Sequence, residues 1–197
     1  MRIRTRHLTA VVFILACATR PAAAQTTDAG FWTALSPSLA KTAKVMHSTI
    51  RRNLAEAAEA MPVSEYSFRP APESRTFAQL IGHVVFANFL LCAQAKGEPP
   101  PSTTNYEQIT DKAALVKALN EALSYCDQVY DSTTDANFSQ PVKVGVGALG
   151  PTDTIRGAVL NFNVTHNNEH YGNIVVYMRV KGHVPPSTAR VQQQRRQ

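Results

Sequence analysis

Residues 74–97 read SRTFAQLIGHVVFANFLLCAQAKG, and this stretch decides the fold. Its apolar residues recur at steps of three and four, which is the period of one helical face. Ser74 is a candidate N-cap, and Gly97 suits the left-handed turn that ends many helices. The pattern predicts a long helix over residues 74–96 that packs one side against other helices.

Three more segments show the same period and are separated by prolines. We predict helices at residues 36–60, from Asp111 to the Asp131-Ser132-Thr133-Thr134 break, and from Thr152 or Asp153 to Gly182. Residues 138–151 alternate valine with other residues, and because one strand cannot form a sheet we expect an extended loop. We therefore expect an all-α fold, a four-helix bundle within residues 25–187, followed by a basic disordered tail at 188–197.

Composition and charge agree with a globular protein and argue against nucleic-acid binding. The 197 residues are 44% hydrophobic and 17% charged, which is enough apolar material for one core. The net charge is +6, but residues 1–24 hold four of the 20 bases and no acid. The remainder has 16 bases against 14 acids, a net charge of +2. Such a chain lacks the basic surface that binds a nucleic-acid backbone.

The first 24 residues are typical of an export signal, and we predict cleavage before Gln25. A basic start precedes an apolar run from Leu8 to Ala18 and a small-residue cleavage site. The apolar run is too short for a membrane span, which needs about 20 residues, and we identify no other candidate span. The sequence ILAC at 14–17 resembles a lipobox, so lipidation of Cys17 is the alternative route. Either route predicts a periplasmic or extracellular protein.

Two cysteines, Cys92 and Cys126, remain after cleavage. In an oxidising compartment they would form a disulfide or stay as two small buried thiols, and the sequence leaves both alternatives open. The absence of a CxxC motif excludes thioredoxin-like chemistry and cysteine-based zinc fingers.

The most informative motif is THNNEHY at residues 165–171. His166 and His170 lie about 40° apart on one helical face, so both imidazoles could reach one metal ion. The same face carries Val159, Phe162, Asn173 and Tyr177. We therefore expect the two histidines to point toward the bundle interior or its mouth.

His83 is the candidate third ligand, because it lies among apolar residues in LIGHVV at 80–85. Gly82 beside it would let another helix approach closely. His47 lies at the margin of the first helical face and His183 beyond the last helix, so we expect neither to be a ligand. Three imidazoles with one open position are typical of catalytic zinc, although nickel and iron also accept such ligands.

Three other polar residues are candidates for roles near this site. Glu169 could orient a ligand or act as a base, although most carboxylates on helices are simply solvated. Asn163 and Tyr177 could supply hydrogen bonds around a pocket or satisfy polar groups of the core.

The motifs MPVSEYSFRP at 61–70, FAQLIGHV at 77–84, HNNEHYG at 166–172 and KGHVPP at 181–186 resemble the DinB/YfiT-like family. The resemblance covers most of residues 35–187. It implies a four-helix bundle that binds a divalent metal through His83, His166 and His170, and it implies a homodimer. Several relatives are metal-dependent transferases or isomerases that use low-molecular-weight thiols.

Three functions follow from these patterns. We expect first a metal-dependent enzyme, of hydrolase or thiol-dependent transferase type, acting on a small molecule that the sequence does not identify. Second, HNNEH fits the HxxEH pattern of a metallopeptidase with Glu169 as base. That class needs a further ligand downstream, and no acid follows Glu169. Third, the bundle could bind a small ligand or hold a structural metal without catalysis.

Overall fold

The computed structural model describes residues 38–146 and 149–196. The predicted export signal, its cleavage site before Gln25 and the alternative lipidation site Cys17 lie outside the described residues. The predicted first helix is seen from Leu39 onward.

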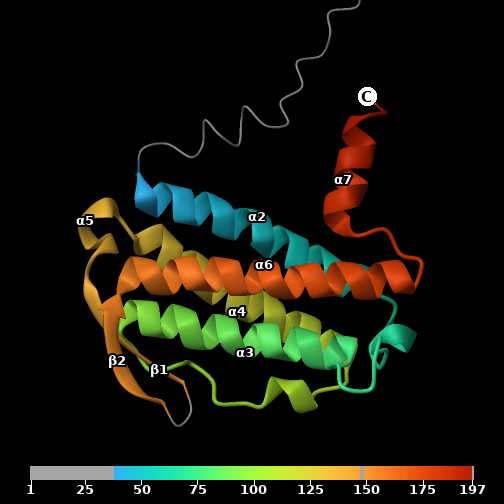
Figure 1. Ribbon diagram of the computed structural model, residues 1–197, viewed down its shortest axis with the longest axis horizontal. Helices are drawn as coiled ribbons and strands as arrows, with labels where there is room; N and C mark the ends of the chain where they lie inside the picture. Colours follow the sequence, from blue (N-terminus) through green and yellow to red (C-terminus); the bar gives the residue numbers. More distant parts are fainter. Residues whose placement is uncertain (1–37, 147–148, 197) are drawn as a thin grey trace, which may run out of the picture.

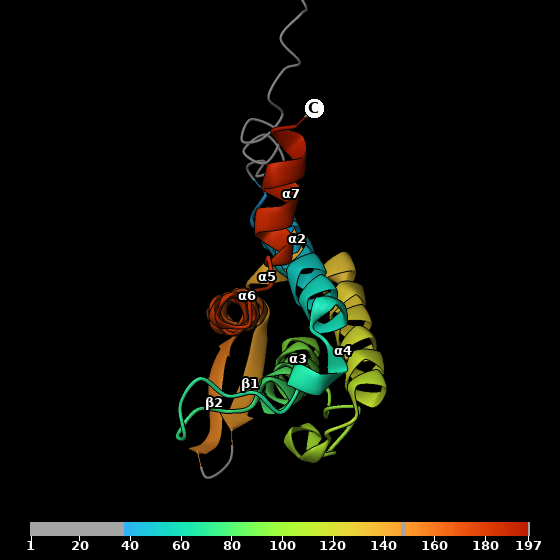
Figure 2. The same ribbon diagram turned by 90° about the vertical axis from the view of Figure 1, so that its right-hand side faces the viewer.

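Four long helices pack side by side and form the body of the protein (Figures 1 and 2), which confirms the predicted bundle. They are α2 (Leu39–Ala60), α3 (Phe77–Lys96), α4 (Lys112–Ser132) and α6 (Arg156–Val180). The shorter elements are η1 (Val63–Glu65), η2 (Tyr106–Gln108), α5 (Asp135–Phe138), β1 (Pro141–Val146), β2 (Leu149–Ile155) and α7 (Pro186–Gln194).

Capping residues at both ends of α3 explain where this helix begins and ends. The side chain of Thr76 accepts a hydrogen bond from the backbone of Gln79, whose side chain accepts one from Thr76 in return. The N-cap is thus Thr76 and not Ser74 as the sequence predicts, because only Thr76 has a glutamine three residues later to complete the box. Gly97 ends the helix with a φ of 81°, as expected.

The segment predicted as an extended loop is an antiparallel hairpin of β1 and β2, so this prediction is wrong. Lys143 pairs in register with Asp153, and their side chains form an ion pair at 2.6 Å. The second strand, LGPTDTI, has no alternation of apolar residues, so the sequence pattern shows only one strand of the pair. The strand also takes up the predicted start of the last helix, which begins instead at Arg156.

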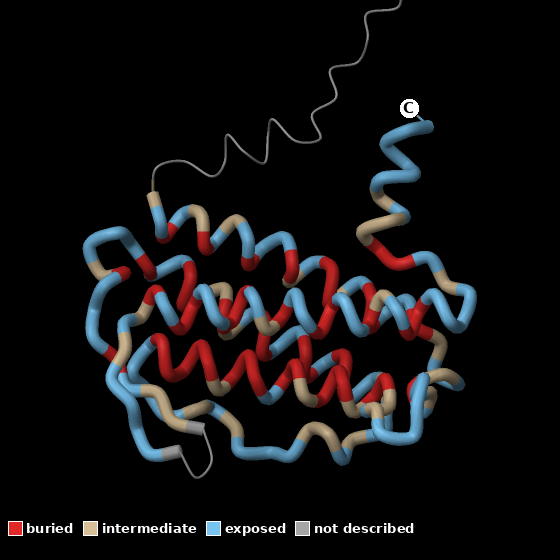
Figure 3. The backbone as a smooth tube through the Cα atoms, viewed as in Figure 1, coloured by how far each residue is buried: buried red, intermediate tan, exposed pale blue. Residues whose placement is uncertain are grey.

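Helix α3 packs against α4, α6 and η2 and is buried along most of its length (Figure 3). Its mean hydropathy of 1.5 over an 18-residue window and its length would allow it to cross a membrane. By length and composition α3 is therefore a candidate span, contrary to our expectation that the sequence holds no other one. Since 72% of that window is buried against the rest of the protein, the apolar surface of α3 is covered by its neighbours.

A disulfide joins Cys92 of α3 to Cys126 of α4 and decides between the two alternatives for these cysteines. Next to it lies a buried polar cluster formed by Asn88, Asn163 and Asn167. Both Asn163 and Asn167 donate side-chain hydrogen bonds to the Asn88 oxygen, at 3.1 and 3.0 Å. The network holds α6 to α3 at a fixed rotation, because each buried amide needs its partner.

The C-terminal segment predicted as a disordered tail begins with a helix, α7, which stands away from the bundle in Figure 1. Pro186 occupies its first turn, where the missing N–H is not needed. The guanidinium of Arg190 contacts Glu56 and Asn53 of α2, and the Tyr171 hydroxyl donates to Ser187 at 2.9 Å. These contacts tie the segment to α2 and α6, which its amino-acid composition does not indicate.

Candidate metal centre

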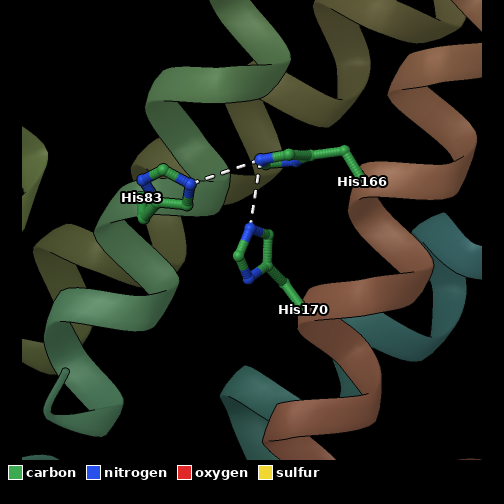
Figure 4. A group of neighbouring side chains, drawn as sticks. All are labelled: His83, His166 and His170. Atoms are coloured by element: carbon green, nitrogen blue, oxygen red, sulfur yellow. Dashed lines mark hydrogen bonds between the residues drawn. The ribbon is translucent and has the colours of Figure 1, made fainter. Parts of the chain in front are cut away.

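Helices α3 and α6 bring the three predicted ligands together (Figure 4). His83 comes from α3, and His166 and His170 come from successive turns of α6. The Nε2 atom of His166 lies 3.2 Å from Nε2 of His83 and 3.0 Å from Nε2 of His170. One nitrogen from each ring lies within 4.8 Å of those of the other two. Three residues from two helices thus turn their ring nitrogens toward a common point.

Counting protons shows why this arrangement suits a cation. His83 Nδ1 faces a carboxylate oxygen of Glu107 at 3.0 Å, so Nδ1 donates a proton to this hydrogen bond and Nε2 is the ring nitrogen turned toward the cluster. His166 Nε2 holds one proton at most and cannot donate to two neighbours at once. A divalent ion accepts the lone pairs of all three neutral rings, so the residues present fit such a group.

The surroundings keep the two rings of α6 neutral. His170 is buried, whereas His83 and His166 are partly exposed. Burial first, and then the charges of His170 and His83, lower the pKa of His166 to about 4. Burial is also the main cause that lowers the pKa of His170. Since a metal binds the deprotonated imidazole, both rings of α6 are ready to coordinate at neutral pH.

Sequence reasoning missed Glu107, the carboxylate behind His83. It lies in η2, between α3 and α4, and its side chain also pairs with Arg75 through two hydrogen bonds of 2.9 and 3.2 Å. Burial works against ionisation of Glu107, but the hydrogen bonds from Arg75 and His83 outweigh it and lower the pKa of this carboxyl. The one signal in the sequence is Gly82, which indicates that something approaches α3 closely without indicating what.

A cavity of about 390 Å³ opens beside the histidines. Its lining includes His170 and Glu169 of α6, Arg75, and Tyr177, whose hydroxyl donates to the Arg75 carbonyl at 2.7 Å. The wall is mixed, with Leu80 and charged groups of both signs. A small molecule in this cavity would lie against one of the three candidate ligands.

With this geometry established, comparison with known proteins identifies the family. A model of the DinB superfamily matches residues 46–174. The chain belongs to the DinB superfamily. YjoA of Bacillus subtilis is 28% identical over 142 residues, which cover 71% of this chain and 89% of YjoA.

Two crystal structures of DinB-like proteins share the fold. One, from Bacillus cereus, has a TM-score of 0.59 at 16% identity and covers 71% of this chain and 90% of its own. The other is that of Bacillus subtilis YjoA, with a TM-score of 0.56 at 20% identity, covering 72% of this chain and 92% of its own. The DinB resemblance inferred from the motifs is therefore confirmed for family and fold.

The remaining candidate residues of this DinB-superfamily chain divide into two groups. Glu169 and Tyr177 line the cavity beside His170. Glu169 is exposed and, within the described part of the chain, forms no ion pair, so its role as a base stays a prediction. Asn163 is fully buried and hydrogen-bonded to Tyr130 and Asn88, so it satisfies buried polar groups of the core and does not line the site.

The two histidines that we expected not to be ligands lie outside the cluster. His47 is buried, stacks on Tyr130 and contacts Asp127 at 2.9 Å. His183 contacts Glu65 at 2.6 Å. Each contacts a carboxylate, and neither belongs to the group of three histidines whose ring nitrogens lie close together.

Two residues predicted on the inward face of the last helix, Phe162 and Asn173, point to solvent instead. Phe162 is 58% exposed and Asn173 is also exposed. The buried face of α6 is centred instead on residues such as Leu160, Asn163 and Asn167. Val159 and Tyr177 are buried as predicted. The buried face is rotated relative to the prediction, because buried asparagines look like surface residues in a hydrophobic pattern. His166 therefore lies at the border between core and solvent, next to the Phe162 ring.

Proposed function

We propose that this protein is an exported metal-dependent enzyme that holds one divalent cation, most simply zinc, through His83, His166 and His170. Nickel and iron are the alternative ions. The observation that carries the proposal is the convergence of three Nε2 atoms, with 3.2 and 3.0 Å between neighbours, at a point beside a cavity. A cation bound there would polarise a substrate or lower the pKa of a water or thiol at its open position.

The chain's own residues supply the rest of the site. The cavity beside His170 is large enough for a small molecule and places it against the cluster. Glu169, one residue before His170 and exposed in the cavity wall, is free to accept a proton from a bound nucleophile. Tyr177 and Arg75 are tied to each other and form a stable side of the cavity. These features suit hydrolysis or a thiol-dependent group transfer, the two reaction types that we propose.

A structural metal is the competing explanation, and the rest of the core argues against the need for one. Helix α3 is already joined to α4 by a disulfide and to α6 by the asparagine cluster. The two histidines of α6 lie in the same helix, so the ion would add only one link between elements. A metallopeptidase is disfavoured because the third ligand is a histidine of α3, upstream of the HxxEH motif, whereas that class needs a further ligand downstream.

Elemental analysis of the purified protein tests the metal site. We expect about one zinc, nickel or iron per chain in the parent and none in a His166→Ala/His170→Ala double variant. His183→Ala is the matched control, since it removes a histidine that pairs with a carboxylate outside the cluster. Absence of metal from the parent after reconstitution with each ion would refute the proposal.

A second measurement separates catalysis from a structural role. Hydrolase and thiol-transfer substrates are screened with the metal-loaded parent, and any activity found is measured in His83→Ala together with thermal unfolding. A catalytic site should lose turnover while the fold persists. Loss of thermal stability in proportion to metal loss, with no substrate turned over by the parent, would favour the structural metal.

Export is proposed from residues 1–24, and the buried disulfide is in keeping with it. N-terminal analysis of the protein recovered from the periplasm of a bacterial host should find Gln25 first. A lipid-modified Cys17 in the membrane fraction would establish the alternative route.

A further inference from the structure

We propose that Glu107 and Arg75 form a positioning pair for His83, and that Gly82 makes this pair possible. The inference rests on the proposed metal site, but it concerns a distinct property, the strength with which His83 binds the ion. Neither Glu107 nor Arg75 reaches the three converging Nε2 atoms. They act through the opposite side of the His83 ring.

Gly82 brings the carboxylate within reach. A Cβ atom at this position would lie 2.3 Å from the Tyr106 carbonyl oxygen and 2.8 Å from the Glu107 nitrogen. Both atoms belong to the backbone, so no side-chain rotation would relieve the overlap. The backbone of η2 therefore crosses directly over α3 at Gly82, the residue before His83. This crossing places the side chain of Glu107, the residue after Tyr106, beside the His83 ring. The close approach expected at Gly82 is real, but the approaching element is the short 3-10 helix η2 and not one of the four long helices.

Arg75 holds the carboxylate in the required direction. Its Nε and Nη2 atoms donate to the two oxygens of Glu107, and one of those oxygens, Oε1, also accepts from His83 Nδ1. Arg75 is itself held at its backbone by the Tyr177 hydroxyl of α6. A continuous path of hydrogen bonds thus leads from α6 through Arg75 and Glu107 to His83.

The pair forms its hydrogen bond with the His83 ring. A carboxylate that accepts the Nδ1 proton fixes the tautomer, so that Nε2 presents its lone pair, and its charge makes the ring a stronger donor. The Nδ1 atoms of His166 and His170 are buried and have no hydrogen-bond partner among the described residues. His83 is therefore the oriented ligand of the three, and we expect metal affinity to depend most on its outer partner.

The test measures metal affinity in variants that leave all three histidines intact. Zinc binding to the metal-free full protein is followed by competition with a chromogenic chelator, for the parent, Glu107→Gln, Glu107→Ala and Arg75→Ala. We expect both Glu107 variants to bind zinc about 10- to 100-fold more weakly. Arg75→Ala should weaken binding less, because the carboxylate remains. The visible absorption of the cobalt-loaded protein should also change in the Glu107 variants.

Glu65→Gln is the matched control. Glu65 lies in the other short helix, η1, and also contacts a histidine, His183, outside the cluster. The same chemical change there should leave zinc affinity and the cobalt spectrum unchanged. Thermal unfolding of each metal-free variant shows whether a loss of affinity merely follows a loss of fold.

Gly82→Ala provides an independent arm, because it displaces η2 without altering any polar group of the site. It should reproduce the weakened zinc binding of Glu107→Ala, and the two changes combined should have little more effect than either alone. Zinc affinity in folded Glu107→Ala equal to that of the parent would overturn the inference. Absence of metal from the parent would instead refute the proposed function.

Discussion

Reduction of the disulfide should lower the free energy of unfolding by about 4 kcal/mol. Cys92 and Cys126 are 34 residues apart in the sequence. Closing a loop of that length removes conformational entropy from the unfolded chain worth about 4 kcal/mol at 25 °C. Because this entropy belongs to the unfolded state, the stabilisation does not depend on contacts around the two sulfurs.

Urea unfolding followed by circular dichroism measures the difference. Both cysteines are fully buried, so the protein is reduced while unfolded and then refolded with reductant present. At a slope of about 2 kcal/mol per molar urea, the midpoint should fall by about 2 M. A chelator in both samples keeps metal binding out of the comparison. Cys92→Ala/Cys126→Ala should resemble the reduced parent, with a further loss from the missing sulfurs.

Two results would contradict this expectation. A difference below about 1 kcal/mol would show that the unfolded chain is not restrained as a 34-residue loop should be. Loss of metal on reduction, in protein that stays folded, would contradict the assignment of the site, because the disulfide links α3 to α4 while the histidines lie on α3 and α6. Retained metal with reduced stability is the expected result.

Three further predictions concern the core. Burial lowers the pKa of His47 from 6.5 despite its Asp127 partner. The unfolded chain therefore takes up a proton that the folded protein does not, and the free energy of unfolding should fall as the pH drops below about 6.5. Urea unfolding from pH 7.5 downward should show a shallower decline of this free energy in His47→Gln than in the parent. Gly157→Ala would place a Cβ 2.1 Å from the Phe138 ring, and a loss of about 1–3 kcal/mol is expected, whereas an unchanged midpoint would show that the ring moves freely. Tyr130→Phe removes a buried hydroxyl that lies 3.0 Å from the Asn163 oxygen and should lower stability by about 1–3 kcal/mol in the same assay, with metal content unaffected.

Much of the bundle is predictable because helices are determined by neighbouring residues. The three- and four-residue spacing of apolar side chains, the cap at Asp111 and the glycine at 97 all act within one or two turns. The pairing of His166 with His170 is equally local, since it follows from helical geometry once the segment is a helix. The choice of His83 needed a further assumption, that two helices meet at this point.

The predictions that are wrong concern features that depend on contacts between residues far apart in the sequence. Asparagines 88, 163 and 167 satisfy one another inside the core, which no hydrophobic pattern can reveal, and Phe162 was assigned to the wrong face as a result. The hairpin was missed because β2 becomes a strand only by pairing with β1. Helix α7 likewise depends on contacts with α2 for its place.

The sequence by itself determined the helices and the two histidines of α6, because their spacing acts over a few residues of chain. Packing of distant segments settles whether Cys92 and Cys126 form a disulfide, where the cavity opens and which carboxylate lies behind His83. Glu107 is 24 residues from His83 along the chain, and nothing in its own neighbours indicates its role. The contact exists because a missing Cβ at Gly82 lets η2 lie against α3, and such a fit is a property of two packed surfaces.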